Sequence, residues 1–296
     1  MTSGPSTTKV QAEVLPAATV VLVRETTGEV LLLLRHARHG FMANVWVFPG
    51  GRVDLGDATV LGGEGPMPAD GVLGDAQLAP FIHAAIRETW EEAGLLLTDP
   101  PRVAAPTEPR DLAAFVAAFG EDASSRASRF LRIEPFARWV TPPSEKRRFD
   151  TVFFLGLVPE LEAVPDHGEV IEARWLHPAT ALNEHRANRL ALAPPTLVTL
   201  HSLLAASYVD GDGYDPHRTE LDITVCWSAG HAERLARWVS STTRPVPPLS
   251  PGLALSAGRL VVSQEPWKPW PVPAPLSRLS GIRLVEGHWQ LDFREG

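Results

Sequence analysis

The chain has 296 residues, 44% of them hydrophobic and 21% charged, which is typical of a globular protein long enough to bury a sizeable core. Its formal net charge of -8 argues against a surface that holds nucleic acid through clustered basic residues, so no nucleic-acid partner is expected. The single cysteine, Cys226, excludes an internal disulfide framework. The 28 Pro and 23 Gly residues predict long irregular segments.

No targeting or membrane segment is expected from the sequence. The first residues, MTSGPSTTKVQAEV, lack the basic end followed by an apolar stretch that marks a secretory signal, and no apolar run approaches membrane-spanning length. These features predict a cytoplasmic protein that makes no membrane contact.

The first predicted elements are two aliphatic strands, residues 17–24 and 29–35, which form a hairpin with Gly28 at the turn. A third short strand, residues 45–48, should end at Pro49-Gly50-Gly51. Residues 53–78 hold many Gly, Asp and Pro without a helical period, which predicts a surface loop. A helix is then expected from Pro80 to Ala93, and Gly94 is placed to end it.

The second half predicts shorter elements. Residues 95–132 contain a Pro-rich connector with helical pieces at 112–119 and 125–131. Strands are expected at 138–140, 151–158 and 173–176, and a helix at 194–206. Beyond Tyr208, strand-like pieces occur at 221–227, 259–263 and 288–293. The last third of the chain is therefore expected to be an extension of mainly strand and irregular structure.

The predicted helix carries three carboxylates on one face. Glu88, Glu91 and Glu92 stand at positions i, i+3 and i+4, and the opposite face holds Ile86, Thr89, Trp90 and Ala93. A bare run of Glu on a helix is most often a solvated face. The upstream glycines, the adjacent Arg87 and the glycine that ends the helix instead favour a site for a hard cation such as Mg²⁺, which prefers oxygen ligands.

These residues resemble the Nudix box, in which a Gly, five residues, a Glu and seven residues precede R-E-apolar-x-E-E-x-G-apolar. Gly51 takes the position of the first Gly, and the stretch from Arg87 to Leu95, RETWEEAGL, matches the second half, with Thr89 at an apolar position. Two departures occur. Asp57 replaces the Glu, and residues 58–86 stand where the pattern has seven residues.

A box interrupted in this way is similar to that of the coenzyme A diphosphatases, a branch of the Nudix family in which a long insertion also splits the box. A second coenzyme A-hydrolysing group has an upstream motif whose spacing from Arg35 to Phe48 fits, but His36, Gly40 and Asn44 occupy its other diagnostic positions. The similarity to the first branch includes the segments LLLLR at 31–35, VFPGG at 47–51, WVTP at 139–142 and KRRFDT at 146–151.

The resemblance implies an α/β fold of the Nudix type, with a mixed β-sheet sandwiched between helices. It places a Nudix domain at residues 1–208, with insertions at 58–83 and 98–134, and a C-terminal extension of unknown role at 209–296.

The resemblance also implies site residues and a divalent cation, Mg²⁺ or Mn²⁺. Glu88, Glu91 and Glu92 are expected to bind the metal, with Asp57 as a further ligand, and Arg87 is expected to orient Glu91 by a salt bridge. The candidates for a further carboxylate supplied from a distant loop are Glu145, Asp150, Glu169 and Glu172. Glu169 is preferred among them as a general base, although a solvated acid is the more common role for each. Residues expected to bind substrate are Arg35, Gly50, Gly51, Arg147 and Arg148.

Three functions follow as hypotheses. The first is metal-dependent hydrolysis of a phosphoanhydride bond in coenzyme A or acyl-coenzyme A. The second is an ADP-ribose or nucleotide-sugar pyrophosphatase that uses the same site. The third is a Nudix-like ligand-sensing module without catalysis, which the three box glutamates argue against. In each case the expected partner is a small nucleotide-type molecule, and a homodimer is possible.

Overall fold

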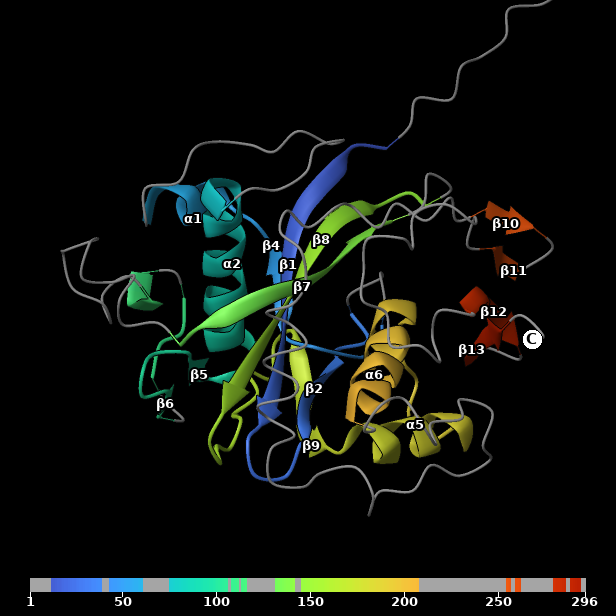
Figure 1. Cartoon of the computed structure of the whole chain (residues 1–296). Coiled ribbons are helices and arrows are strands. Elements are labelled where there is room, and N and C mark those ends of the chain that lie inside the picture. The colour runs from blue at the N-terminus through green and yellow to red at the C-terminus, as the bar shows by residue number, and fades with distance from the viewer. Residues whose placement is uncertain are drawn as a thin grey trace, which may run out of the picture.

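A mixed seven-stranded sheet forms the centre of the computed structural model (Figure 1). Strands β1 and β8 run parallel, and the other pairs are antiparallel. The main path runs β3 (Trp46–Val47), β2 (Val30–Arg35), β1 (Val14–Arg24), β8 (Arg148–Val158) and β7 (Ile133–Val140), while β4 (Gly50–Arg52) also pairs with β1 and β9 (Val170–Leu176) with β2. The structure describes residues 12–38, 43–60, 75–105, 108–111, 113–115, 131–141, 145–207, 254–256, 259–261, 279–285 and 288–293.

Helices cover both faces of this sheet. Helix α2 (Asp75–Ala93), with α1 (Leu55–Val60) beside it, packs on one face, and α5 (Pro178–Arg186) and α6 (Pro194–Ser207) pack on the other (Figure 1). Alternate side chains of β1 therefore enter two separate clusters: Val20 packs with α2, whereas Val21 packs with α5 and α6. The predicted α/β fold, a mixed sheet between helices, is confirmed.

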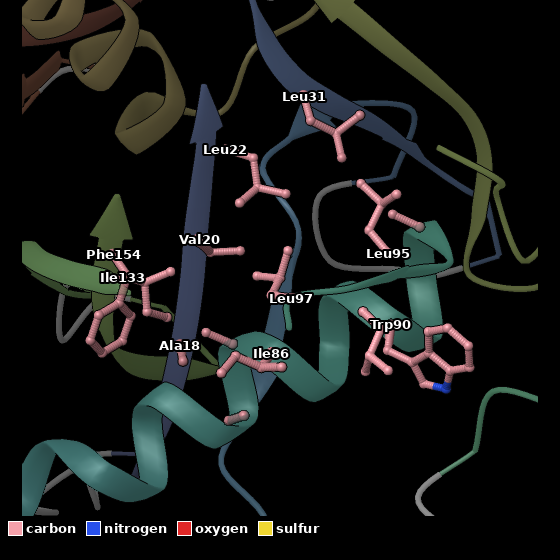
Figure 2. Packing of buried hydrophobic residues seen from close by; sticks show 14 of the residues in the cluster. Ala18, Val20, Leu22, Leu31, Ile86, Trp90, Leu95, Leu97, Ile133 and Phe154 are labelled. Atoms are coloured by element: carbon pink, nitrogen blue, oxygen red, sulfur yellow. The ribbon is translucent and has the colours of Figure 1, made fainter. Parts of the chain in front are cut away.

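The α2 side of the sheet fixes the orientation of that helix. Ile86 and Trp90 are fully buried and belong to the cluster of hydrophobic side chains that packs α2 against the sheet (Figure 2). The predicted apolar face is confirmed, because Thr89 and Ala93 are buried with them. With these side chains in the core, the three glutamates must lie on the other side of the helix.

Several elements differ from the sequence predictions. Helix α1 lies inside the predicted loop 53–78, and α2 begins at Asp75 rather than Pro80, within the predicted insertion 58–83. Buried Leu78 and Phe81 extend the apolar stripe of α2, so packing outweighs the tendency of Pro to start a helix. Strand β7 begins five residues before the predicted strand at 138–140, and the pair β5 (Leu95–Leu96) and β6 (Arg102–Val103) and helix α5 were not predicted.

The C-terminal strands form a separate four-stranded antiparallel sheet of β10 (Ala254–Ser256), β11 (Arg259–Val261), β12 (Leu279–Val285) and β13 (His288–Phe293). Strand β13 matches its predicted range, whereas β10 and β12 were not predicted. This sheet meets the main body where β13 packs beside α6 and Leu291 contacts the adjoining core. The predicted elements at 125–131 and 221–227, and the predicted boundary at 208, lie outside the described residues.

Within these described ranges, no helix combines the length and the apolarity needed to cross a membrane.

Candidate active site

A cavity of about 710 Å³ lies where α2, β4 and the ends of several strands meet. It has an acidic part on α2 and a largely aromatic part on β7 and β8. The lining includes the predicted site residues Arg35, Gly50, Gly51, Arg87, Glu88, Glu91, Glu92, Arg147 and Glu169.

Helix α2 presents the three box glutamates to this cavity, and they differ in how far they are buried. Glu92 is only 4% exposed, whereas the side chains of Glu88 and Glu91 are 14% and 28% exposed. The backbone N–H of Gly50 donates to Glu92 Oε2 at 3.0 Å, so strand β4 fixes the deepest carboxylate. The helical period predicted the shared face, and the packing of Trp90 on the opposite side produces it.

Arg87 links the acidic helix face to α1. Its Nε and Nη2 donate to Asp57 Oδ1 and Oδ2, both at 2.9 Å, and its Nη1 donates to Glu88 at 2.9 Å and to Glu91 at 3.0 Å. Nη2 also donates to the carbonyl of Arg52. The expected Arg87–Glu91 salt bridge is therefore present. Because both oxygens of the buried Asp57 bind Arg87, its geometry is that of a guanidinium partner, and its predicted role as a metal ligand has no geometric support.

The two glycines of β4 allow the backbone to approach its neighbours closely. A Cβ on Gly50, whose φ is +155°, would lie 2.3 Å from the carbonyl oxygen of Ala18 in β1. A Cβ on Gly51 would lie 2.4 Å from the carboxyl carbon of Glu88. Gly50 therefore serves the pairing with β1, and Gly51 leaves room for a box carboxylate.

Burial makes these carboxylates harder to ionise. It raises the pKa of Glu88 to about 7, with Arg87 acting in the opposite direction and Glu91 adding to the rise. Burial also raises the pKa of Glu91, and it raises that of Glu92 well above its usual range, where Glu88 adds to the effect. The pKa of Arg87 is raised: burial opposes its charge, but the hydrogen bond with Asp57 and the nearby glutamates outweigh burial. The cluster therefore holds more carboxylate than one arginine compensates.

This donor set fits a hard divalent cation. Carboxylate oxygens on one helix face are the ligands that Mg²⁺ and Mn²⁺ prefer, and a cation would favour the ionised forms that burial disfavours. In the described part of the chain, no three acidic, His or Cys side chains already converge on one point. Arg87 binds Oε1 of Glu88 and Oε2 of Glu91, so the other oxygen of each carboxylate can still bind a cation.

Arg35 and Glu169 reach the same cavity from β2 and from the turn before β9. Arg35 lies close enough to Glu92 to favour its ionised form, and its Nε is buried without a hydrogen-bond partner among the described residues. The Glu169 carboxylate raises the pKa of both Glu88 and Glu92. The structure thus brings together residues that are far apart in the sequence.

The two predicted arginines of the basic stretch differ in position. Arg147 lines the cavity, whereas Arg148 donates to the carbonyls of Thr141 at 3.1 Å and Ala12 at 3.4 Å and is not among the lining residues. Arg148 was predicted to bind substrate because it is basic and adjacent to Arg147. Successive residues of a strand point to opposite faces, and Arg148 is the first residue of β8.

An aromatic wall of the cavity was not predicted. Phe149 and Phe153 on β8, Trp139 on β7, and Phe48 form it, and Pro194 and Pro195 at the start of α6 continue it. The period-two spacing of residues 149, 151 and 153 is visible in the sequence and indicates one shared face. In the sequence these residues indicated strands and formed part of the segments that carry the family resemblance, but they did not predict a shared wall. Arg52, Asp54 and Glu145 also line the cavity without having been predicted to bind substrate.

Comparison with known proteins shows similarity to Nudix hydrolases. Residues 75–203 match the family model of the NUDT19 Nudix domain. The chain is 33% identical over 201 residues to "Putative nudix hydrolase 7" from Caenorhabditis elegans, an alignment that covers 66% of this chain and 62% of that protein. It is 28% identical over 229 residues to "Acyl-coenzyme A diphosphatase NUDT19" from Xenopus laevis, with 59% of each chain covered. The chain thus spans less than two thirds of the length of these two relatives.

A solved structure supports the same assignment. The crystal structure of a NUDIX hydrolase from Alicyclobacillus acidocaldarius superimposes with a TM-score of 0.54 at 29% identity, covering 65% of this chain and 92% of that one. The matched region includes the helix with the three glutamates, which the sequence resemblance had already singled out. The chain is therefore similar to Nudix hydrolases and, among them, to the coenzyme A diphosphatase branch.

Proposed function

We propose that this chain is a diphosphatase that requires Mg²⁺ or Mn²⁺ and hydrolyses coenzyme A or acyl-coenzyme A at its phosphoanhydride bond. The observation that carries the proposal is that one cavity is lined both by the carboxylate face of α2 and by an aromatic wall. A substrate with a diphosphate between two larger groups fits such a site. The relatives named as acyl-coenzyme A diphosphatases support coenzyme A as the substrate class.

In the proposed reaction a water molecule attacks one phosphorus of the diphosphate, the bridging P–O bond breaks, and two phosphate monoesters leave. A bound divalent cation would neutralise phosphate charge and acidify water. Glu91 and Glu92 are the proposed ligands, with Glu88 as ligand or base and Glu169 as a candidate general base. Arg87 orients Glu91 and Glu88 through the two salt bridges of its Nη1.

The remaining lining residues are proposed to bind the substrate. Arg35 and Arg147 are the cationic side chains suited to phosphate oxygens, and the unpartnered Nε of Arg35 supports its part in this role. The aromatic wall, which includes Trp139 and Phe149, offers flat apolar surface to the part of the substrate beyond the diphosphate.

The second candidate is a pyrophosphatase for ADP-ribose or nucleotide sugars. It would use the same carboxylates, and the aromatic wall could equally stack a nucleoside base. The non-catalytic sensing module is the weakest alternative, because all three box glutamates are present and face the cavity.

Turnover of a panel of coenzyme A, acyl-coenzyme A, ADP-ribose and nucleotide sugars, with Mg²⁺, with Mn²⁺ and with EDTA, tests the proposal. Glu91→Gln and Glu92→Gln should each lower turnover by about 100-fold or more, because each removes a charged ligand. Glu172→Gln is the matched control, since Glu172 forms an exposed ion pair with Arg174 outside the cavity. Undiminished activity in both box variants would refute the site, whereas a preference for ADP-ribose would refute only the substrate assignment.

A cytoplasmic location and a homodimer stay part of the proposal. Cell fractionation tests the first, and the mass of the full chain by light scattering tests the second.

A further inference from the structure

The turn that carries Glu169 is built around one set of hydrogen bonds to a single carboxylate. The Asp166 carboxylate accepts three backbone N–H groups: Oδ2 accepts from Gly168 at 3.1 Å and from Glu169 at 2.8 Å, and Oδ1 accepts from Val170 at 2.8 Å. A Cβ on Gly168 would lie 2.8 Å from Asp166 Oδ2, so the turn closes tightly around this carboxylate. A single side chain thus fixes the backbone on both sides of Glu169.

The same turn is attached to the end of the helix that carries the box glutamates. The backbone N–H of Asp166 donates to the carbonyl of Glu92 at 3.2 Å, and that of Val164 donates to the carbonyl of Ala93 at 2.8 Å. The last carbonyls of a helix have no partner within it, so the turn satisfies two of them. Arg110 adds hydrogen bonds to the carbonyls of Val164 and Pro165.

A third attachment joins the turn to the strand that carries Arg35. The N–H of His36 donates to the carbonyl of Glu169 at 2.8 Å. Beside it the β2–β9 register shifts: Leu34 lies opposite Glu172 but Arg35 lies opposite Val170, which leaves Ile171 as the extra residue of a bulge. A bulge of this kind bends the strand locally, and here it lies beside Arg35 and Glu169, which both line the cavity.

From these contacts we infer that Asp166 is a positioning residue, which holds the Glu169 carboxylate against Glu88 and Glu92 for the reaction. The inference rests on the proposed function. A carboxylate on a free surface turn would sample many backbone and side-chain states, and a catalytic group that is misplaced by about 1 Å loses on the order of 100-fold in rate. Asp166 removes that freedom without itself lining the cavity.

The test is a double-mutant cycle on the full chain, with Asp166→Ala, Glu169→Gln and the double variant, assayed with the best substrate of the panel. Asp166→Ala should lower kcat by about 10- to 100-fold with little change in KM, because substrate contacts remain. In the Glu169→Gln background the same change should alter kcat by less than about twofold, since Asp166 acts through Glu169. Asp166→Asn, which keeps one acceptor oxygen in place, should give an intermediate kcat.

Two further measurements separate positioning from a general structural role. Amide hydrogen exchange should show the N–H groups of Gly168, Glu169 and Val170 protected in the wild type and exposed in Asp166→Ala, with α2 unaffected. The control variant Glu172→Ala, which lies in β9 just after this turn, should leave kcat and amide exchange unchanged.

The outcomes distinguish the inference from the function on which it rests. A wild-type chain that turns over no substrate of the panel overturns both. Turnover by the wild type with an unchanged kcat in Asp166→Ala or in Glu169→Gln overturns the inference alone. So does a kcat loss in Asp166→Ala that is just as large in the Glu169→Gln background.

Discussion

Replacing Asp57 with Asn removes the negative charge that faces the buried guanidinium of Arg87. Two hydrogen bonds of 2.9 Å join these side chains, and both residues are 5% exposed or less. Breaking a buried ion pair by changing one partner costs about 3–5 kcal/mol. Arg87 keeps Glu88, Glu91 and the carbonyl of Arg52, so we expect about 3 kcal/mol, the lower end of that range.

Urea unfolding of the full chain in EDTA and in saturating MgCl₂ measures this cost and tests whether Asp57 is a metal ligand. If Asp57 only pairs with Arg87, Asp57→Asn should lose the same free energy of unfolding in both conditions. If Asp57 is a metal ligand, the variant should lose more when Mg²⁺ is present, because metal binding stabilises only the folded state that can bind it. Glu172→Gln is the control and should change the midpoint little, since its ion pair is exposed. Destabilisation by Asp57→Asn that appears only with Mg²⁺ would refute the reasoning.

Three other predictions follow from the site. Gly51→Ala should lower Mg²⁺-dependent turnover by about 10- to 100-fold, because the new Cβ displaces the Glu88 carboxylate. Gly50→Ala should mainly lower the melting temperature, because its Cβ meets the backbone of β1. Equal melting temperatures in the two variants would contradict this difference. In EDTA the folded chain should lose stability as pH rises from about 4.5 through about 7. The folded pKa of Glu88 lies above its unfolded value, so the folded state binds the proton more tightly. Roughly 1.4 kcal/mol per pKa unit bounds the contribution of Glu88 at about 3 kcal/mol. Glu88→Gln should reduce the loss of stability between pH 5 and pH 8 in urea unfolding, while the raised pKa values of Glu91 and Glu92 still contribute to it; an unchanged loss would exclude Glu88 as a cause. Trp90→Ala should cost about 3–5 kcal/mol in the same assay, since Trp90 is fully buried, and a loss below 1 kcal/mol would show that the site collapses around the cavity.

The acidic helix face could be predicted from the sequence because it depends on local geometry alone. The spacing of Glu88, Glu91 and Glu92 sets their shared direction once the segment is helical, and Trp90 at its own spacing predicts which side is buried. The strand pattern likewise predicted the central strands, and the ordered box residues carried the resemblance to Nudix hydrolases that implied the α/β class. The element ends were less predictable, as α2 shows by beginning at Asp75.

Other parts of the site depend on contacts between distant segments, which no local pattern contains. The sequence offered Asp57 as a metal ligand by its position in the box, but the folded chain places α1 so that both carboxylate oxygens meet Arg87. The sequence also suggested both Arg147 and Arg148 as substrate-binding residues. Only Arg147 lines the cavity, whereas Arg148, the first residue of β8, donates to the carbonyl of Thr141.

Helical periodicity by itself thus determined the acidic face, since that face follows from the local geometry of one helix, and the ordered box residues carried the resemblance that implied the class of fold. Only the tertiary structure decided what faces that acidic side: the aromatic wall of β7 and β8, the arginine from β2, and the turn that holds Glu169. These residues meet because the sheet order places strands distant in sequence beside one another, and side-chain packing against two helix layers sets which of their faces opens into the cavity.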